Sequence, residues 1–165
     1  MNPTSKNSPA VHPRFEIVSA RIFEAPRDVV FDAFATPRHL AEWWGPKGFT
    51  NVFKEFDLRA EGAWRFIMRA PDGTEYDNVK RFLEVVQPER VVFEHLGPMH
   101  RFKMTMTYED LGASTRLTWQ MVFESAESES LKRFISEANE QNFDRLNASL
   151  KQNRQRGIQN TVGDA

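Results

Sequence analysis

Residues 101–123, RFKMTMTYEDLGASTRLTWQMVF, alternate between bulky apolar and polar side chains on both sides of a turn at Asp110 to Gly112. Alternation with a period of two predicts β-strands with one buried face. The short turn predicts that the two strands are antiparallel neighbours. The residues expected on the buried face are Phe102, Met104, Met106, Tyr108, Leu117, Trp119, Met121 and Phe123.

Similar segments precede this hairpin, and turn residues separate them. Strands are expected at 15–24, 49–59, 62–70, 74–86, 89–96, 101–109 and 114–123. The short connections after residue 49 predict a meander of consecutive hairpins. The sequence therefore predicts a curved antiparallel sheet of about seven strands.

Helix signals occur in two places. Pro26 begins an apolar stripe made of Val29, Val30, Phe31 and Phe34. The Thr36–Pro37 pair is typical of a second helix start. These two short helices follow the first strand and end near 43–46. A long helix is expected from 127 to about 152, with Ser125 as its N-cap.

The predicted fold class is α+β: a helix-grip fold in which the curved sheet wraps the long C-terminal helix. The single domain is expected at 15–150. Residues 1–14 hold three prolines and no apolar period, which predicts a disordered tail. Residues 151–165 are polar, which predicts a second, frayed tail.

Composition excludes several functional classes. The chain has 165 residues, no cysteine and a formal net charge of -1. A thiol nucleophile and thiolate metal sites are therefore excluded, and neither nucleic acid nor a membrane is expected as a partner. No stretch has the length of a membrane helix, so a soluble, cytoplasmic protein is expected. The 14 phenylalanines and four tryptophans call for either a solid core or the walls of a pocket.

Residues 20–46, ARIFEAPRDVVFDAFATPRHLAEWWGP, resemble the opening of the homologues of the activator of the heat-shock protein 90 ATPase. That family belongs to the START-like, pollen-allergen-like helix-grip superfamily (SRPBCC). Residues 62–66, 71–76, 88–93 and 143–146 are also similar, so the resemblance covers about 15–150. It implies that Trp43 and Trp44 lie at a pocket mouth, with Trp64, Phe66 and Tyr76 on the gripping sheet.

Two positions depart from this family's pattern. Ala138 and Asn139 replace a common Gly-Trp pair, and Lys80 stands where a small residue is usual. Lys80 is expected either to reach a ligand carboxylate or, the favoured reading, to extend its ammonium outward. The complete set of expected cavity walls is Trp43, Trp44, Phe53, Trp64, Phe66, Met68, Tyr76, Asn78, Lys80, Phe93, His95, Met104, Met106, Trp119, Met121, Phe134 and Ala138.

Signals for chemistry are weak in this sequence. No nucleophile motif, phosphate loop or metal-ligand spacing occurs, so no metal or cofactor is expected and catalytic residues stay unassigned. His95 is the best candidate for acid–base work, although Glu94 should point away from it. His39 is expected among exposed helix residues.

Three functions follow in order of preference. The first is binding of a hydrophobic or aromatic small molecule between the sheet and the C-terminal helix. The second is an enzyme of the polyketide cyclase or aromatase type, which needs a polar residue deep in the cavity. The third is an interaction module for a chaperone. A homodimer through a strand edge or the outer apolar residues Val18, Ile22 and Val52 is left open.

Overall fold

The computed structural model describes residues 15–124 and 128–163. The predicted tail at 1–14 and the predicted N-cap Ser125 lie outside these residues. The elements in chain order are β1 (Phe15–Phe23), α1 (Arg27–Ala35), α2 (Pro37–Trp43), β2 (Thr50–Phe56), β3 (Ala63–Arg69), β4 (Glu75–Val86), β5 (Arg90–Gly97), β6 (Phe102–Asp110), β7 (Thr115–Phe123) and α3 (Glu129–Gly163).

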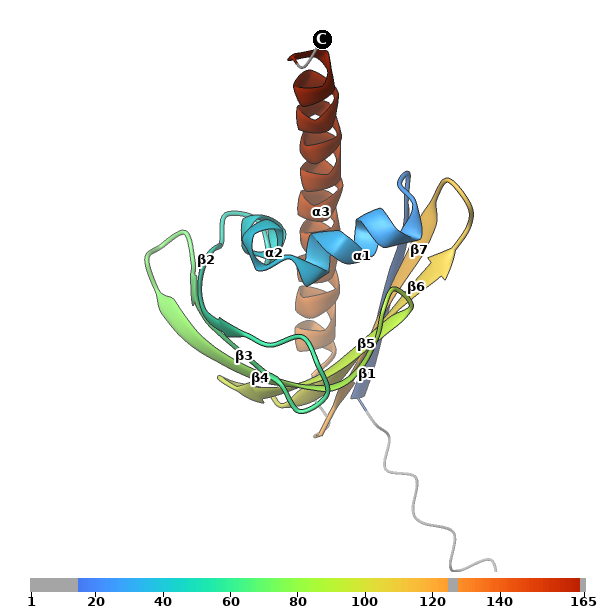
Figure 1. The fold of residues 1–165 in the computed structure, drawn as a ribbon. Helices are drawn as coiled ribbons and strands as arrows, with labels where there is room; N and C mark the ends of the chain where they lie inside the picture. Colours follow the sequence, from blue (N-terminus) through green and yellow to red (C-terminus); the bar gives the residue numbers. More distant parts are fainter. Residues whose placement is uncertain (1–14, 125–127, 164–165) are drawn as a thin grey trace, which may run out of the picture.

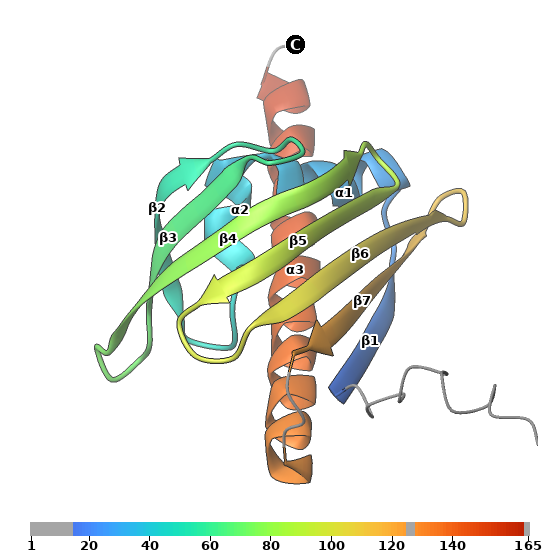
Figure 2. The ribbon, with the colours of Figure 1, turned by 90° about the horizontal axis from the view of Figure 1, so that it is seen from below.

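The strands form one antiparallel sheet in the order β1-β7-β6-β5-β4-β3-β2. Five consecutive hairpins join β2 to β7, and β1 closes the row by pairing with β7. The sheet bends into a trough, with α3 along its concave side and α1 and α2 across one end (Figure 1). Seen from below, the strands cross in front of α3 (Figure 2). The predicted α+β helix-grip fold is confirmed.

The helix boundaries follow the sequence signals at the start of the chain. Pro26 is the N-cap of α1, Thr36 is the N-cap of α2, and Pro37 is the first helical residue. The C-terminal helix differs from expectation, because α3 continues past residue 150, where a frayed tail is predicted, to Gly163. Polar composition alone does not end a helix that contains no Pro.

The core lies between the sheet and the helices, and aromatic side chains fill most of it. Phe34 of α1 is fully buried, with its ring 5.5 Å from Trp64 and 6.0 Å from Trp44 between ring centroids. The ring of Trp119 of β7 lies 4.6 Å from that of Phe143 of α3, in a tilted arrangement, whereas the Phe34 pairs are edge to face. Edge-to-face ring pairs add stability beyond the area that they bury. The alternation in the strands thus builds one continuous aromatic core.

Two side chains of α3 hold the segment after α2 in place. Asn142 donates to the Trp43 carbonyl and accepts from the backbone N–H of Gly45. Arg145 Nη1 donates to the carbonyl oxygens of Trp44, Gly45 and Pro46 at 2.9–3.2 Å. The carbonyl groups at a helix end lack partners within the helix, and these contacts supply them. We refer to Asn142 and Arg145 as the α3 clamp.

Candidate functional site

Lys80 of β4 is buried inside the sheet, with 4% of its surface exposed. A register shift between Val79 and Lys80 places Lys80 directly opposite His95 of β5. The favoured expectation that its ammonium extends outward is therefore wrong. Bulges of this kind often re-aim a side chain at a functional site.

Four aromatic rings surround the Lys80 amine. Its Nζ atom lies 5.2 to 5.7 Å from their centroids, a distance that suits cation–π contact. No carboxylate of the described residues pairs with it within 4.0 Å. We call this group the lysine cage, and its rings belong to Trp64, Phe66, Phe93 and Phe102.

His95 is the hydrogen-bonding partner of the caged amine. Lys80 Nζ lies 2.8 Å from His95 Nδ1, and His95 Nε2 lies 2.8 Å from the Pro98 carbonyl oxygen. A carbonyl can only accept, so Nε2 carries the proton and Nδ1 accepts from Lys80. The His95 ring also stacks on Phe102 at 4.9 Å. The imidazole is thus held in one neutral tautomer.

Burial changes the acidity of both groups. It lowers the pKa of Lys80 from 10.5 to about 7, because the ammonium loses its hydration. The pKa of His95 falls to about 3, first through burial and then through repulsion from the Lys80 charge. Near neutral pH the pair therefore contains a neutral imidazole beside an amine that is partly uncharged.

The structure brings most predicted wall residues together, but they largely contact one another. Residues that are buried or partly buried inside the grip include Trp43, Trp44, Phe53, Trp64, Phe66, Met68, Tyr76, Asn78, Phe93, Met104, Met106, Trp119 and Met121. On α3, Ala138 is half-buried, and its neighbour Asn139 is buried and donates to Ser19 Oγ. Their use as ligand-binding walls stays a prediction.

Phe134 is the exception among the predicted walls. Its side chain is 67% exposed, whereas Ile135 packs on the core. The helix repeat places only one of two neighbouring residues toward the sheet, and Ile135 takes that position. Phe134 therefore does not line the interior.

Two indole groups in the core lack hydrogen-bond acceptors. Trp64 Nε1 and Trp119 Nε1 are buried without a partner among the described residues. By contrast, Trp43 Nε1 donates to the Ala33 carbonyl at 2.9 Å. An unsatisfied buried donor costs free energy, so either indole N–H could donate to a polar group that entered the interior. The Trp64 ring is one of the four around Lys80.

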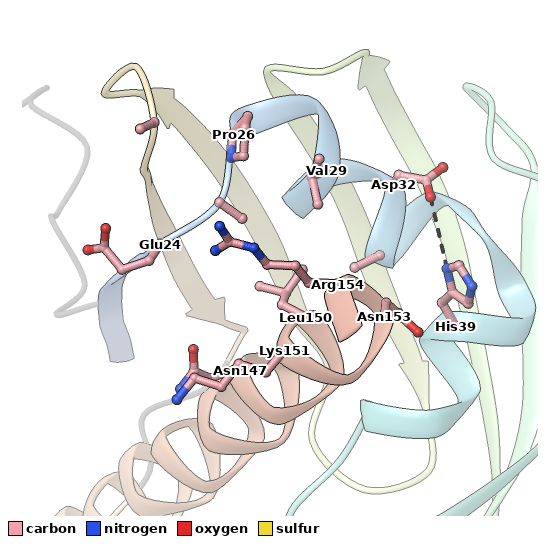
Figure 3. Close-up of a pocket in the computed structure, with 13 residues that line it drawn as sticks. Glu24, Pro26, Val29, Asp32, His39, Asn147, Leu150, Lys151, Asn153 and Arg154 are labelled. Carbon is pink, nitrogen blue, oxygen red and sulfur yellow. Dashed lines mark ion pairs between the residues drawn. The ribbon is translucent and has the colours of Figure 1, made fainter. Parts of the chain in front are cut away.

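A cavity lies outside the aromatic core, between α1 and the C-terminal half of α3. Its volume is about 660 Å³, within the range of small-molecule sites. Figure 3 shows Arg154 reaching from α3 into the space below Pro26 and Val29. We call this cavity the α1–α3 cleft; its lining residues are Glu24, Ala25, Pro26, Val29, Asp32, Ala33, His39, Ala113, Asn147, Leu150, Lys151, Asn153 and Arg154.

Buried hydrogen bonds fix the floor of the α1–α3 cleft. Thr115 of β7, itself fully buried, donates to the Ala25 carbonyl at 2.7 Å. The bond from Trp43 to Ala33 anchors α1 to α2 behind the cleft. On the rim, His39 Nδ1 lies 3.9 Å from an Asp32 carboxylate oxygen (Figure 3). The cleft is therefore a preformed feature with an apolar floor and a polar rim.

The residues that line the α1–α3 cleft are not predicted from the sequence. Val29 is assigned to the apolar stripe of α1, but it is 46% exposed whereas Val30 is buried. His39 is half-buried rather than exposed. Arg154 lies in the polar segment expected to fray. The available signal is the adjacent Val29–Val30 pair, because two neighbouring helix residues cannot both face the sheet.

Comparison with known proteins gives a consistent result. A family described as "Activator of Hsp90 ATPase homolog 1-like protein" matches residues 24–151. No curated protein matches the chain.

Among the described residues, no cluster of three or more His, Cys, Asp or Glu side chains suits a metal ion. No described helix has the length and apolar character needed to cross a membrane.

Solved structures share the fold. A protein from Chromobacterium violaceum has 26% identity and a TM-score of 0.73, covering 82% of this chain and 96% of that one. One from Arthrobacter aurescens has 23% identity and a TM-score of 0.75, covering 83% and 86%. A Silicibacter pomeroyi protein described as AHSA1 has 18% identity and a TM-score of 0.71, covering 84% and 99%.

Proposed function

We propose that this chain, which belongs to the Activator of Hsp90 ATPase homolog 1-like family, binds a hydrophobic or aromatic small molecule. The helix-grip fold is consistent with ligand binding. The observation that carries the proposal is the 660 Å³ α1–α3 cleft. The ligand contacts Val29, Ala33 and Leu150 on the apolar side of this cleft.

Two cations at the rim favour a ligand with an acidic group. The lining holds two acidic side chains, Glu24 and Asp32, and two basic ones, Lys151 and Arg154. None of the ion pairs between described residues involves Lys151 or Arg154. The planar guanidinium of Arg154 can bind a carboxylate through two parallel hydrogen bonds. Asp32 lies beside His39, away from Arg154 in this view (Figure 3). An aromatic carboxylic acid fits both parts of the cleft.

Binding is tested with 2-naphthoic acid and neutral naphthalene-2-carboxamide, by calorimetry and thermal denaturation. A ligand at 100 times its Kd should stabilise the fold by about 2.7 kcal/mol. Val29→Arg fills the cleft with a charged side chain and should abolish binding. Val52→Arg is the matched control, because Val52 is an exposed valine of β2 far from the lining residues.

Two variants separate the role of the Arg154 charge from that of the apolar side of the cleft. Arg154→Gln should weaken binding of the acid and leave binding of the amide unchanged. Binding that survives Val29→Arg would contradict the cleft and favour the aromatic interior, where the Trp64 and Trp119 indoles lack acceptors. Absence of binding by a broad panel of apolar compounds would overturn the proposed function.

An enzymatic role is a second candidate, favoured by one observation. Such a role requires a polar group deep in the grip, and Asn78, Lys80 and His95 are all buried. The chaperone-interaction role stays a prediction with the lowest rank. A chaperone ATPase assay with and without this protein tests that role directly.

A further inference from the structure

A second cavity lies at the opposite end of the sheet from the α1–α3 cleft. Its volume is about 410 Å³, and it is lined by residues at the ends of β5, β6 and β7. Two of them, His95 and Phe102, directly contact the Lys80 amine. The stacked His95–Phe102 pair therefore separates this cavity from the buried amine.

We propose that Lys80 is a covalent attachment site for a small aldehyde, which enters through this second cavity and forms an imine with Nζ. Three geometric features carry the proposal. The amine is buried among four aromatic rings, and the neutral His95 is its one hydrogen-bonding partner within residues 15–124 and 128–163. An opening of suitable size lies one ring layer away. The site is separate from the cleft of the proposed function.

The surroundings favour a carbonyl compound over a carboxylate. A carboxylate would lose its hydration on entering the lysine cage, at a cost of several kcal/mol. An aldehyde carries no charge, and neither does the neutral imine. Desolvation in an apolar pocket is also a known way to activate a lysine as a nucleophile. The lowered pKa of Lys80 agrees with this, because a substantial fraction of the amine is uncharged near pH 7.

The chemical step balances without a co-reactant. The lone pair of Lys80 Nζ forms a bond to the carbonyl carbon, and the carbonyl π electrons move to oxygen. A proton passes from nitrogen to that oxygen, with His95 Nδ1 placed 2.8 Å from Nζ to carry it. The second proton on the nitrogen then passes by the same route to the hydroxyl group, the nitrogen lone pair forms the C=N bond, and the C–O bond breaks so that water leaves. His95 acts here as a positioning and proton-carrying residue.

The test uses the full chain, butanal or benzaldehyde as the probe, and sodium cyanoborohydride at pH 7 to reduce the imine. Peptide mass spectrometry then measures labelling at every lysine. Lys80 should be labelled at least about tenfold faster than the exposed Lys54 of β2, because an ordinary lysine is almost fully protonated at this pH. Unfolding in urea should abolish the preference.

Variants separate the roles of the two residues. His95→Gln should slow the labelling of Lys80 and change its pH profile, with little effect at Lys54. Lys54→Met is the matched control, because Lys54 lines neither cavity, and it should leave the labelling of Lys80 unchanged. Equal labelling of Lys80 and Lys54, or no labelling of Lys80 in the folded wild-type chain, would overturn the proposal. Neither result affects the cleft, which is tested by non-covalent binding.

Discussion

The amide nitrogen of Asn142 lies 2.7 Å from the carbonyl oxygen of Trp43, joining residues 99 positions apart in the chain. Both side chains are buried, and Asn142 accepts a second hydrogen bond from Gly45. This bond fixes the end of α2 against α3. Because Trp43 also anchors Ala33, the α3 clamp supports the wall of the α1–α3 cleft.

Asn142→Ala should therefore lower the free energy of unfolding by about 1–3 kcal/mol, since the Trp43 carbonyl and the Gly45 N–H lose buried partners. The matched control is Gln141→Ala, which removes an exposed hydrogen bond to the Lys47 N–H. That variant should change stability by less than about 0.5 kcal/mol. Urea denaturation monitored by tryptophan fluorescence measures both. Equal effects would contradict the clamp.

Two phenylalanines test the assignment of core and surface. Phe34 is fully buried among Trp44, Phe56, Trp64 and Phe82, so Phe34→Ala should cost about 3–5 kcal/mol. Phe134→Ala makes the same chemical change at a side chain that is 67% exposed and should cost less than about 0.5 kcal/mol. Thermal denaturation of both variants checks the difference. A comparable loss at Phe134 would mean that this side chain is not on the surface.

The caged lysine should give the fold a distinct pH dependence. The pKa of Lys80 is about 7 in the folded chain, against an ordinary 10.5. Between these values the unfolded chain holds a proton that the folded chain has released, so the free energy of unfolding rises with pH. The gain in the free energy of unfolding that comes from releasing this proton is complete above about pH 10.5. It is lost as the pH falls to about 7.

Lys80→Met removes this contribution, so its stability relative to wild type should increase as the pH falls from 10 to 6. Lys103→Met serves as the control, because Lys103 is exposed on β6, two strands away from Lys80, and it should retain the wild-type slope. Urea denaturation at pH 6, 8 and 10 measures the three proteins. A wild-type pH slope in Lys80→Met would show that Lys80 is not protonated differently in the two states.

The sequence predicts the fold well because apolar alternation and turn residues act locally. The hairpin at 101–123 follows this pattern: Met106 and Trp119 are paired across β6 and β7, and both face inward. The prediction of Lys80 fails for a non-local reason. Its partner His95 lies 15 residues away on β5, and a bulge sets their register.

The α1–α3 cleft could not be predicted from the sequence for a similar reason. Its lining comes from α1, α2, α3, the segment after β1 and the β6–β7 turn. No motif links Val29 to Arg154, and only the packing of the helices brings them to one cavity. The buried stripe of α3 also includes the polar residues Asn139, Asn142 and Ser149. A search for apolar periodicity therefore does not identify this stripe completely.

The pairing of β6 with β7 sets the separation of the two proposed sites. Phe102 and Phe123 are partners at one end, beside the second cavity, and Asp110 and Thr115 are partners at the other, beside the α1–α3 cleft. Eight strand residues span about 27 Å, more than twice the screening length at ordinary ionic strength. Occupants at the two ends would not compete, so a chain saturated at both carries two molecules, and their binding free energies add.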